Sequence, residues 1–263
     1  MSSLSHAVTD STTMLRRNLL HMLRYPSLTV ILVGMPVVFL LLFVYVLGGT
    51  LGAGLAGPSG GRADYVDYVA PGILMLTVVG VTQSAALSVS MDMTEGIVDR
   101  FRTMAISRAS MLTGHVLGTL FQTMVGLAVV TGVALLVGFR PDASTVEWIA
   151  SVGVLAMITF ALTWLMVAMG LAARSVESAS NLPMPLMLLP FFGSGFVPTD
   201  SMPTALRLFA EYQPFTPFIE TLRGLLMGTP IGNSAVVTVA WCAGIALVGY
   251  LWARAAYDRG RAR

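Results

Sequence analysis

The stretch Met91–Arg108, MDMTEGIVDRFRTMAISR, decides how this sequence is interpreted, because it is a charged segment between two long apolar ones. It holds three carboxylates and three arginines in a chain of which only 11% of residues are charged. We call it the 91–108 segment. A charged helix held at one side of a membrane gives a soluble partner protein a surface to bind. We therefore interpret the 91–108 segment as a contact for such a partner.

The composition is that of an integral membrane protein. Hydrophobic residues make up 56% of the 263 residues, whereas a soluble domain is usually about one-quarter charged. Because one crossing uses about 20 apolar residues, the chain is long enough for several spans. The net charge of +2 is too small to indicate nucleic-acid binding.

Residue usage excludes several kinds of chemistry. All 15 basic residues are arginine, and a Walker A loop needs a lysine that reaches the β- and γ-phosphates. The single cysteine, Cys242, cannot form a disulfide within the chain. The three histidines, His6, His21 and His115, have no second ligand at metal-binding spacing. We therefore expect neither a P-loop ATPase nor a bound cofactor or metal in this chain.

The apolar pattern predicts an all-α membrane domain, residues 28–256, with six transmembrane helices. The expected spans are about 28–47, 68–90, 111–139, 148–173, one that begins near 181 and is interrupted by prolines and glycines, and 234–256. Six crossings place both termini on the same side. Eleven arginines flank the spans on that side and four lie opposite, so the positive-inside rule places both termini and the 91–108 segment in the cytoplasm.

Residues 1–27 form a cytoplasmic arm that does not have the apolar core of a signal peptide. Leu15, Leu19, Met22 and Leu23 recur at helical spacing among arginines, which predicts an amphipathic helix in the membrane interface. A soluble basic tail is the alternative. Residues 257–263 are a short cytoplasmic tail.

Residues 197–232, expected on the outer side, are too apolar for an ordinary loop and predict two external re-entrant helices. Arg207 and Glu211 are spaced as an i,i+4 pair, and Glu220 and Arg223 as an i,i+3 pair. We expect Thr216 to cap the second helix and Gly228 to end it. A plain surface hairpin is the alternative.

Polar residues inside the spans are few. They are Gln83 and Ser84 in the second span, and His115, Thr119 and Gln122 along one face of the third. They line either a substrate path or contacts between helices, where each hydrogen bond contributes about 0.6 kcal/mol. No Asp or Glu lies near the centre of a span, which argues against transport coupled to an ion or a proton.

Within the 91–108 segment, Thr94 is suited to cap a short helix and Glu95 to its first turn. Ile97, Phe101 and Met104 recur at i, i+4 and i+7, which gives this helix an apolar ridge bordered by charges. A solvated loop without a partner is the alternative.

Three stretches resemble the type-2 ABC transporter permeases, most closely the daunorubicin- and doxorubicin-resistance kind. They are Arg17–Gly49 (the interfacial helix and first span), Asp92–Arg108 (the coupling helix), and Gly195–Pro203 with Gln213–Gly228 (the fifth span and the external re-entrant helices). Together they cover nearly the whole chain and occur in the family's order.

The resemblance implies the permease of an ATP-driven exporter in the bacterial plasma membrane, which moves an amphiphilic or hydrophobic substrate outward. A second permease chain, identical or related, and two copies of a cytoplasmic ABC ATPase that binds ATP and Mg²⁺ are the implied partners, in addition to membrane lipids. The implied coupling residues are Asp92, Glu95, Gly96, Asp99, Arg100, Phe101, Arg102 and Arg108. Ala105 departs from the pattern, since family members commonly have proline there. A membrane scaffold that binds a cytoplasmic partner through the 91–108 segment without transport is the alternative function.

Overall fold

The computed structural model describes residues 26–56, 61–94 and 108–259, and within these ranges every regular element is helical. Five helical stretches in the described part are long and apolar enough to cross a membrane. The first is a continuous run of α2 (Pro26–Leu42), a π-helical turn η1 (Phe43–Leu47) and α3 (Gly48–Ala56). The others are α4 (Arg62–Thr94), α6 (Arg108–Val137), α7 (Thr145–Ala172) and α12 (Ser234–Arg259).

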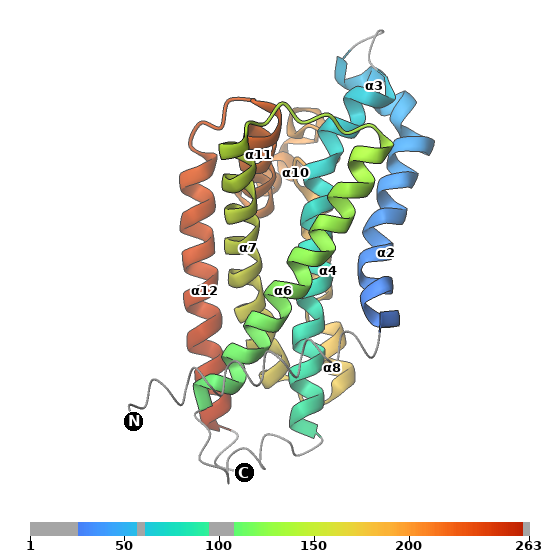
Figure 1. The fold of residues 1–263 in the computed structure, drawn as a ribbon. Helices are drawn as coiled ribbons and strands as arrows, with labels where there is room; N and C mark the ends of the chain where they lie inside the picture. The colour runs from blue at the N-terminus through green and yellow to red at the C-terminus, as the bar shows by residue number, and fades with distance from the viewer. Residues whose placement is uncertain (1–25, 57–60, 95–107, 260–263) are drawn as a thin grey trace.

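Shorter elements connect α7 to α12. They are α8 (Val176–Asn181), α9 (Met184–Leu188), η3 (Leu189–Phe192), η4 (Thr199–Ser201), α10 (Thr204–Tyr212) and α11 (Phe215–Met227). In Figure 1, α3, α10 and α11 lie at the top of the bundle, which we call the α11 end. The opposite end, the α8 end, holds α8, the start of α2 and the end of α12. The chain therefore passes from one end to the other between α8 and α10 in short pieces.

The second, third, fourth and sixth predicted spans agree with the structure in place, and each helix is longer than expected, α4 by the most. Helix α4 begins six residues before the predicted span and continues to Thr94, and α12 continues to Arg259. Helix α7 begins where the sequence provides a capping box, in which the Ser144 hydroxyl accepts from the Glu147 amide and the Glu147 carboxylate accepts from the Ser144 amide at 2.6 Å. Gly228 ends α11 in the left-handed conformation, with φ of 66°.

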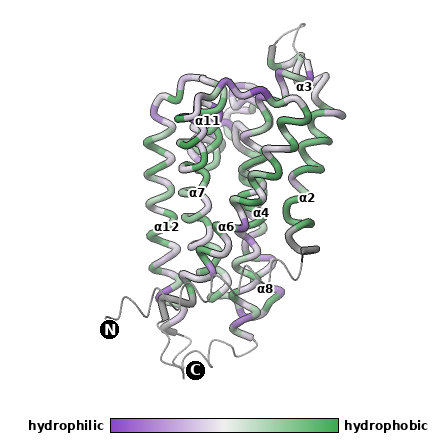
Figure 2. The backbone as a smooth tube through the Cα atoms, viewed as in Figure 1, coloured by the Kyte–Doolittle hydropathy of each residue, from purple (hydrophilic) through white to green (hydrophobic). Residues whose placement is uncertain are grey.

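Helix α4 lies at the centre of the molecule. It contacts α2, α3, α6, α7, α8, α9 and α11, and most of its residues are buried. Helices α2, α6 and α12 instead present exposed apolar side chains such as Val30, Leu136 and Val236. Hydrophobic residues follow the long helices and hydrophilic ones gather toward the two ends (Figure 2). These exposed faces suit contact with lipid.

Small residues allow the helices to pack backbone to backbone. A Cβ added at Gly170 of α7 would lie 2.5 Å from the Ala86 carbonyl oxygen of α4, and one added at Gly72 would lie 2.7 Å from the Gly195 carbonyl oxygen. At Gly249 of α12 an added Cβ would lie 2.7 Å from the Leu165 nitrogen of α7. Close approach at small residues is a main source of helix association in lipid, where apolar burial gives little.

We predict that Gly249→Ala lowers the melting temperature of the purified protein in detergent. The added methyl group would meet the backbone of α7, which cannot move aside without separating the helices, at a cost of about 1–3 kcal/mol. Gly244→Ala on the same helix is the matched control, since a Cβ there has nothing within 4 Å. An equal effect of both changes on the melting temperature would contradict this packing.

Candidate functional site

The 91–108 segment is described only at its two ends. Met91–Thr94 form the last turn of α4, and Arg108 begins α6 at the α8 end of the bundle. Thr94 therefore belongs to the second span instead of capping a new helix, and its hydroxyl donates to the carbonyls of Ser90 and Met91. The remaining predicted coupling residues, Glu95, Gly96, Asp99, Arg100, Phe101 and Arg102, lie outside the described residues, as do Ala105 and the predicted interfacial helix.

Asp92, the first predicted coupling residue, is buried and pairs with a second predicted residue. Its Oδ2 lies 3.1 Å from Nε2 of His115 on α6, and the two residues are 7% and 8% exposed. An ionised carboxylate accepts from the Nε2–H group, which gives both side chains a partner. No acidic residue lies near His115 in the sequence, and the hairpin of α4 and α6 brings Asp92 to it from 23 residues away.

The other polar residues of the spans are placed among helix contacts. The Gln83 side chain of α4 donates through Nε2 to the Ser180 carbonyl of α8 at 3.0 Å. Thr119 of α6 is buried and Gln122 is half-buried and engaged with another group. Gln83 and His115 thus both have partners on a neighbouring helix, which is the arrangement expected of residues that hold helices together.

A half-buried arginine at the α11 end was not singled out as a site residue. The guanidinium of Arg223 on α11 donates to the carbonyls of Tyr68 and Ser194 at 3.1 and 2.7 Å, and its carbon lies 3.9 Å from the centre of the Tyr68 ring. Burial lowers the pKa of this guanidinium from its ordinary value. The expected pairing with Glu220 is replaced by these contacts, and Glu220 instead accepts from the Ser234 hydroxyl.

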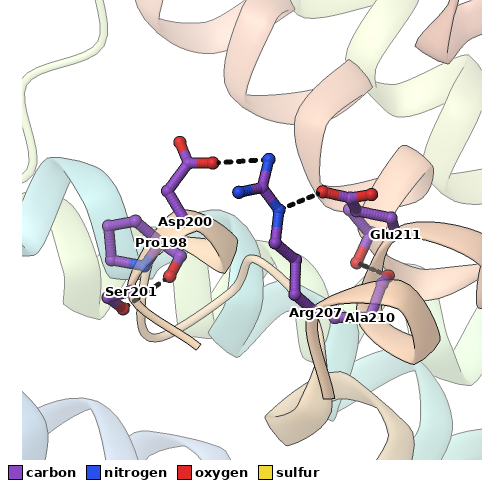
Figure 3. A network of polar contacts seen from close by, with 7 residues as sticks. Pro198, Asp200, Ser201, Arg207, Ala210 and Glu211 are labelled. Atoms are coloured by element: carbon purple, nitrogen blue, oxygen red, sulfur yellow. Dashed lines mark hydrogen bonds and ion pairs between the residues drawn. The ribbon is translucent and has the colours of Figure 1, made fainter. Parts of the chain in front are cut away.

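An exposed polar network on α10 bonds this helix to η4, the short element that precedes it. Figure 3 shows Arg207 between Asp200 and Glu211, with distances of 2.9 and 2.7 Å. The pair with Glu211 confirms the predicted i,i+4 spacing. Thr216 does not cap α11, which begins at Phe215, and its hydroxyl instead donates to the Ala210 carbonyl of α10. This bond ties the two short helices together.

The family follows from the comparison with known proteins, because the family model "ABC-2 type transporter" matches residues 9–227. The chain belongs to this family. The ABC-2 match covers α2 to α11, and so includes the Asp92–His115 pair and Arg223. The protein is therefore a multi-pass membrane permease of the ABC-2 type.

Two ABC-2 relatives match most of the chain. The chain is 29% identical over 225 residues to the daunorubicin resistance ABC transporter permease protein DrrB1 of Streptomyces coeruleorubidus. The aligned residues make up 85% of this chain and 77% of the relative. The chain is also 24% identical over 214 residues to the probable doxorubicin resistance ABC transporter permease protein DrrC of Mycobacterium tuberculosis. This alignment covers 81% of this chain and 75% of the relative.

We predict that Gln83→Met lowers the stability of the protein. The change keeps the length of the side chain and removes the amide that donates to Ser180, at a cost of about 1 kcal/mol. Ser84→Ala is the control, because the Ser84 hydroxyl donates to Val81 within its own helix. The measurement is the melting temperature in detergent, and a Gln83→Met protein as stable as the control would show that this bond does not hold α8 to α4.

Proposed function

We propose that this ABC-2 permease is the membrane subunit of an exporter that moves amphiphilic or hydrophobic compounds out of the cell, and that a separate ABC ATPase drives it. The observation that carries this proposal is the family match over residues 9–227, together with the names of two relatives that connect them to daunorubicin and doxorubicin resistance. The sequence contains no lysine for a Walker A loop. The proposed motor is therefore another chain.

In this proposal the α8 end faces the cytoplasm and the α11 end faces outward. Of the arginines in the described residues, four belong to segments at the α8 end (Arg108, Arg174, Arg254 and Arg259) and four to segments at the α11 end (Arg62, Arg140, Arg207 and Arg223). The sequence of the N-terminal arm, the 95–107 connection and the C-terminal tail, which join the helices that end on the α8 side, contains seven more arginines, and together these give the bias that the positive-inside rule requires. The chain then crosses six times, with the pieces between α8 and α10 as the fifth crossing.

We predict that a cysteine placed at Asp142 reacts with a membrane-impermeant maleimide in intact cells, and that one placed at Glu177 does not. Both positions are exposed, one in the loop before α7 and one on α8. Cys242→Ser provides the background, since Cys242 is the single cysteine. Both positions should react after the membrane is permeabilised. Labelling of Glu177→Cys alone in intact cells would reverse the proposed orientation.

The 91–108 segment is the proposed contact for the ATPase, and two permease chains and two ATPase subunits form the proposed complex. Asp92, Glu95, Gly96, Asp99, Arg100, Phe101, Arg102 and Arg108 are its proposed coupling residues. The sequence of the segment has charges of both signs and apolar residues at helical spacing, which is the chemistry expected of a surface that fixes the orientation of a bound protein. We assign the polar residues of the second and third spans to helix contacts instead of a substrate path, because Gln83 and His115 are bonded to neighbouring helices. These residues are Gln83, His115, Thr119 and Gln122.

We predict that Asp99→Lys combined with Arg102→Glu abolishes export while the protein still inserts into the membrane. Reversing both charges keeps the net charge and disrupts the pattern that orients the ATPase. The measurement is ATP-dependent export of doxorubicin by the permease reconstituted in vesicles with its ATPase. A complex whose ATPase is inactivated by replacement of its Walker A lysine gives the background level of export. Export at the parental rate by the double variant would contradict the assignment of the segment.

A further inference from the structure

We propose that Asp92 and His115 form a latch that fixes the register of α4 against α6, so that the two helices move as one body when the 95–107 connection is displaced. The inference rests on the proposed function, because it assumes that an ATPase acts on that connection. It adds a role for two residues that lie inside the membrane domain. Neither needs to touch the ATPase for this role.

The position of the pair is the first argument. Asp92 lies in the last turn of α4 and His115 in the second turn of α6. The bond therefore joins the two helices close to the connection between them. A force on residues 95–107 reaches both helices through these turns. With the bond in place, neither helix slides along the other.

The chemistry of the pair is the second argument. A carboxylate at the C-terminal end of a helix lies at the negative end of the helix dipole, and a buried charge costs free energy unless it is paired. Replacing such a pair by apolar residues of similar volume is often neutral or stabilising. Stability therefore does not require this pair, whereas a directional bond fixes register in a way that an apolar contact cannot.

A second bond holds the same two helices at the opposite end. The Asp67 carboxylate of α4 accepts from the backbone amide of Arg140, just after α6, at 2.9 Å. Between the two bonds, Gly126 of α6 lies against Thr77 and Val81 of α4. Helices α4 and α6 are thus joined at the α8 end, in the middle and at the α11 end. The hairpin of α4 and α6 is therefore suited to move as one rigid body along the whole length of the bundle.

The first test compares three variants in the reconstituted complex, with doxorubicin as the probe. His115→Phe, which keeps a ring and removes the donor, and Asp92→Leu combined with His115→Leu, should each lower export per ATP hydrolysed by about tenfold, in the range of typical coupling free energies. The leucine pair should keep the parental melting temperature. The exchange Asp92→His with His115→Asp should recover most of the export, because it restores the bond with its partners swapped. Parental export by the leucine pair, or no recovery by the exchange, would overturn the latch.

The second test does not depend on the substrate. Spin labels at Ser88 of α4 and Leu117 of α6, both exposed, are introduced in the Cys242→Ser background and diluted with unlabelled permease. Their separation should be the same with and without ATP in the parent, and should shift by about 2 Å or more in the leucine pair, the size of a helix shift. An unchanged separation in the leucine pair would overturn the latch. Failure of the parent permease to bind any ABC ATPase would instead overturn the proposed function.

Discussion

Close backbone packing around α4 is the constraint on which the rest of the structure depends. Lipid provides little apolar driving force for helix association, so contact at small residues has to supply much of it. Gly170 meets Ala86, and Gly195 meets Gly72, at two levels of α4 that are 14 residues apart. These contacts bury α4 within a bundle whose other long helices expose apolar side chains. Because α4 runs from the α11 end to the α8 end, most of the described helices pack against it, and α12 and α10 are positioned through α7 and α11.

The polar residues near α4 follow from a second constraint of the membrane. The chain between α8 and α10 is broken by prolines and glycines, and carbonyls that lose their helical partners are costly in lipid. Side chains from intact helices supply donors at three of these carbonyls. Gln83 donates to Ser180, Tyr65 to Phe196 and Arg223 to Ser194. These three side chains therefore stabilise the broken crossing.

The sequence predicts what depends on local pattern and misses what depends on long-range pairing. The long helices were predictable because each is a long apolar run, and so were Arg207 with Glu211 and the end of α11 at Gly228. Arg223 was assigned to Glu220 because spacing on one helix says nothing about carbonyls on another segment. For the Asp92–His115 contact the sequence offered one signal, because both residues lie within two turns of the helix ends that the 95–107 connection joins, and such turns of a helical hairpin lie close together.

These constraints together explain how the two ends of the molecule are connected. At the α8 end, α4 is bonded to α6 through His115, and at the α11 end Asp67 and the Tyr68 carbonyl join it to the loop after α6 and to α11. Close-packed interiors transmit displacement because they have little free volume to absorb it. A movement of α4 at the α8 end is therefore transmitted through α4 itself to Arg223 and to helices α10 and α11. The residues that bond to α4 at its two ends decide which neighbours move with it.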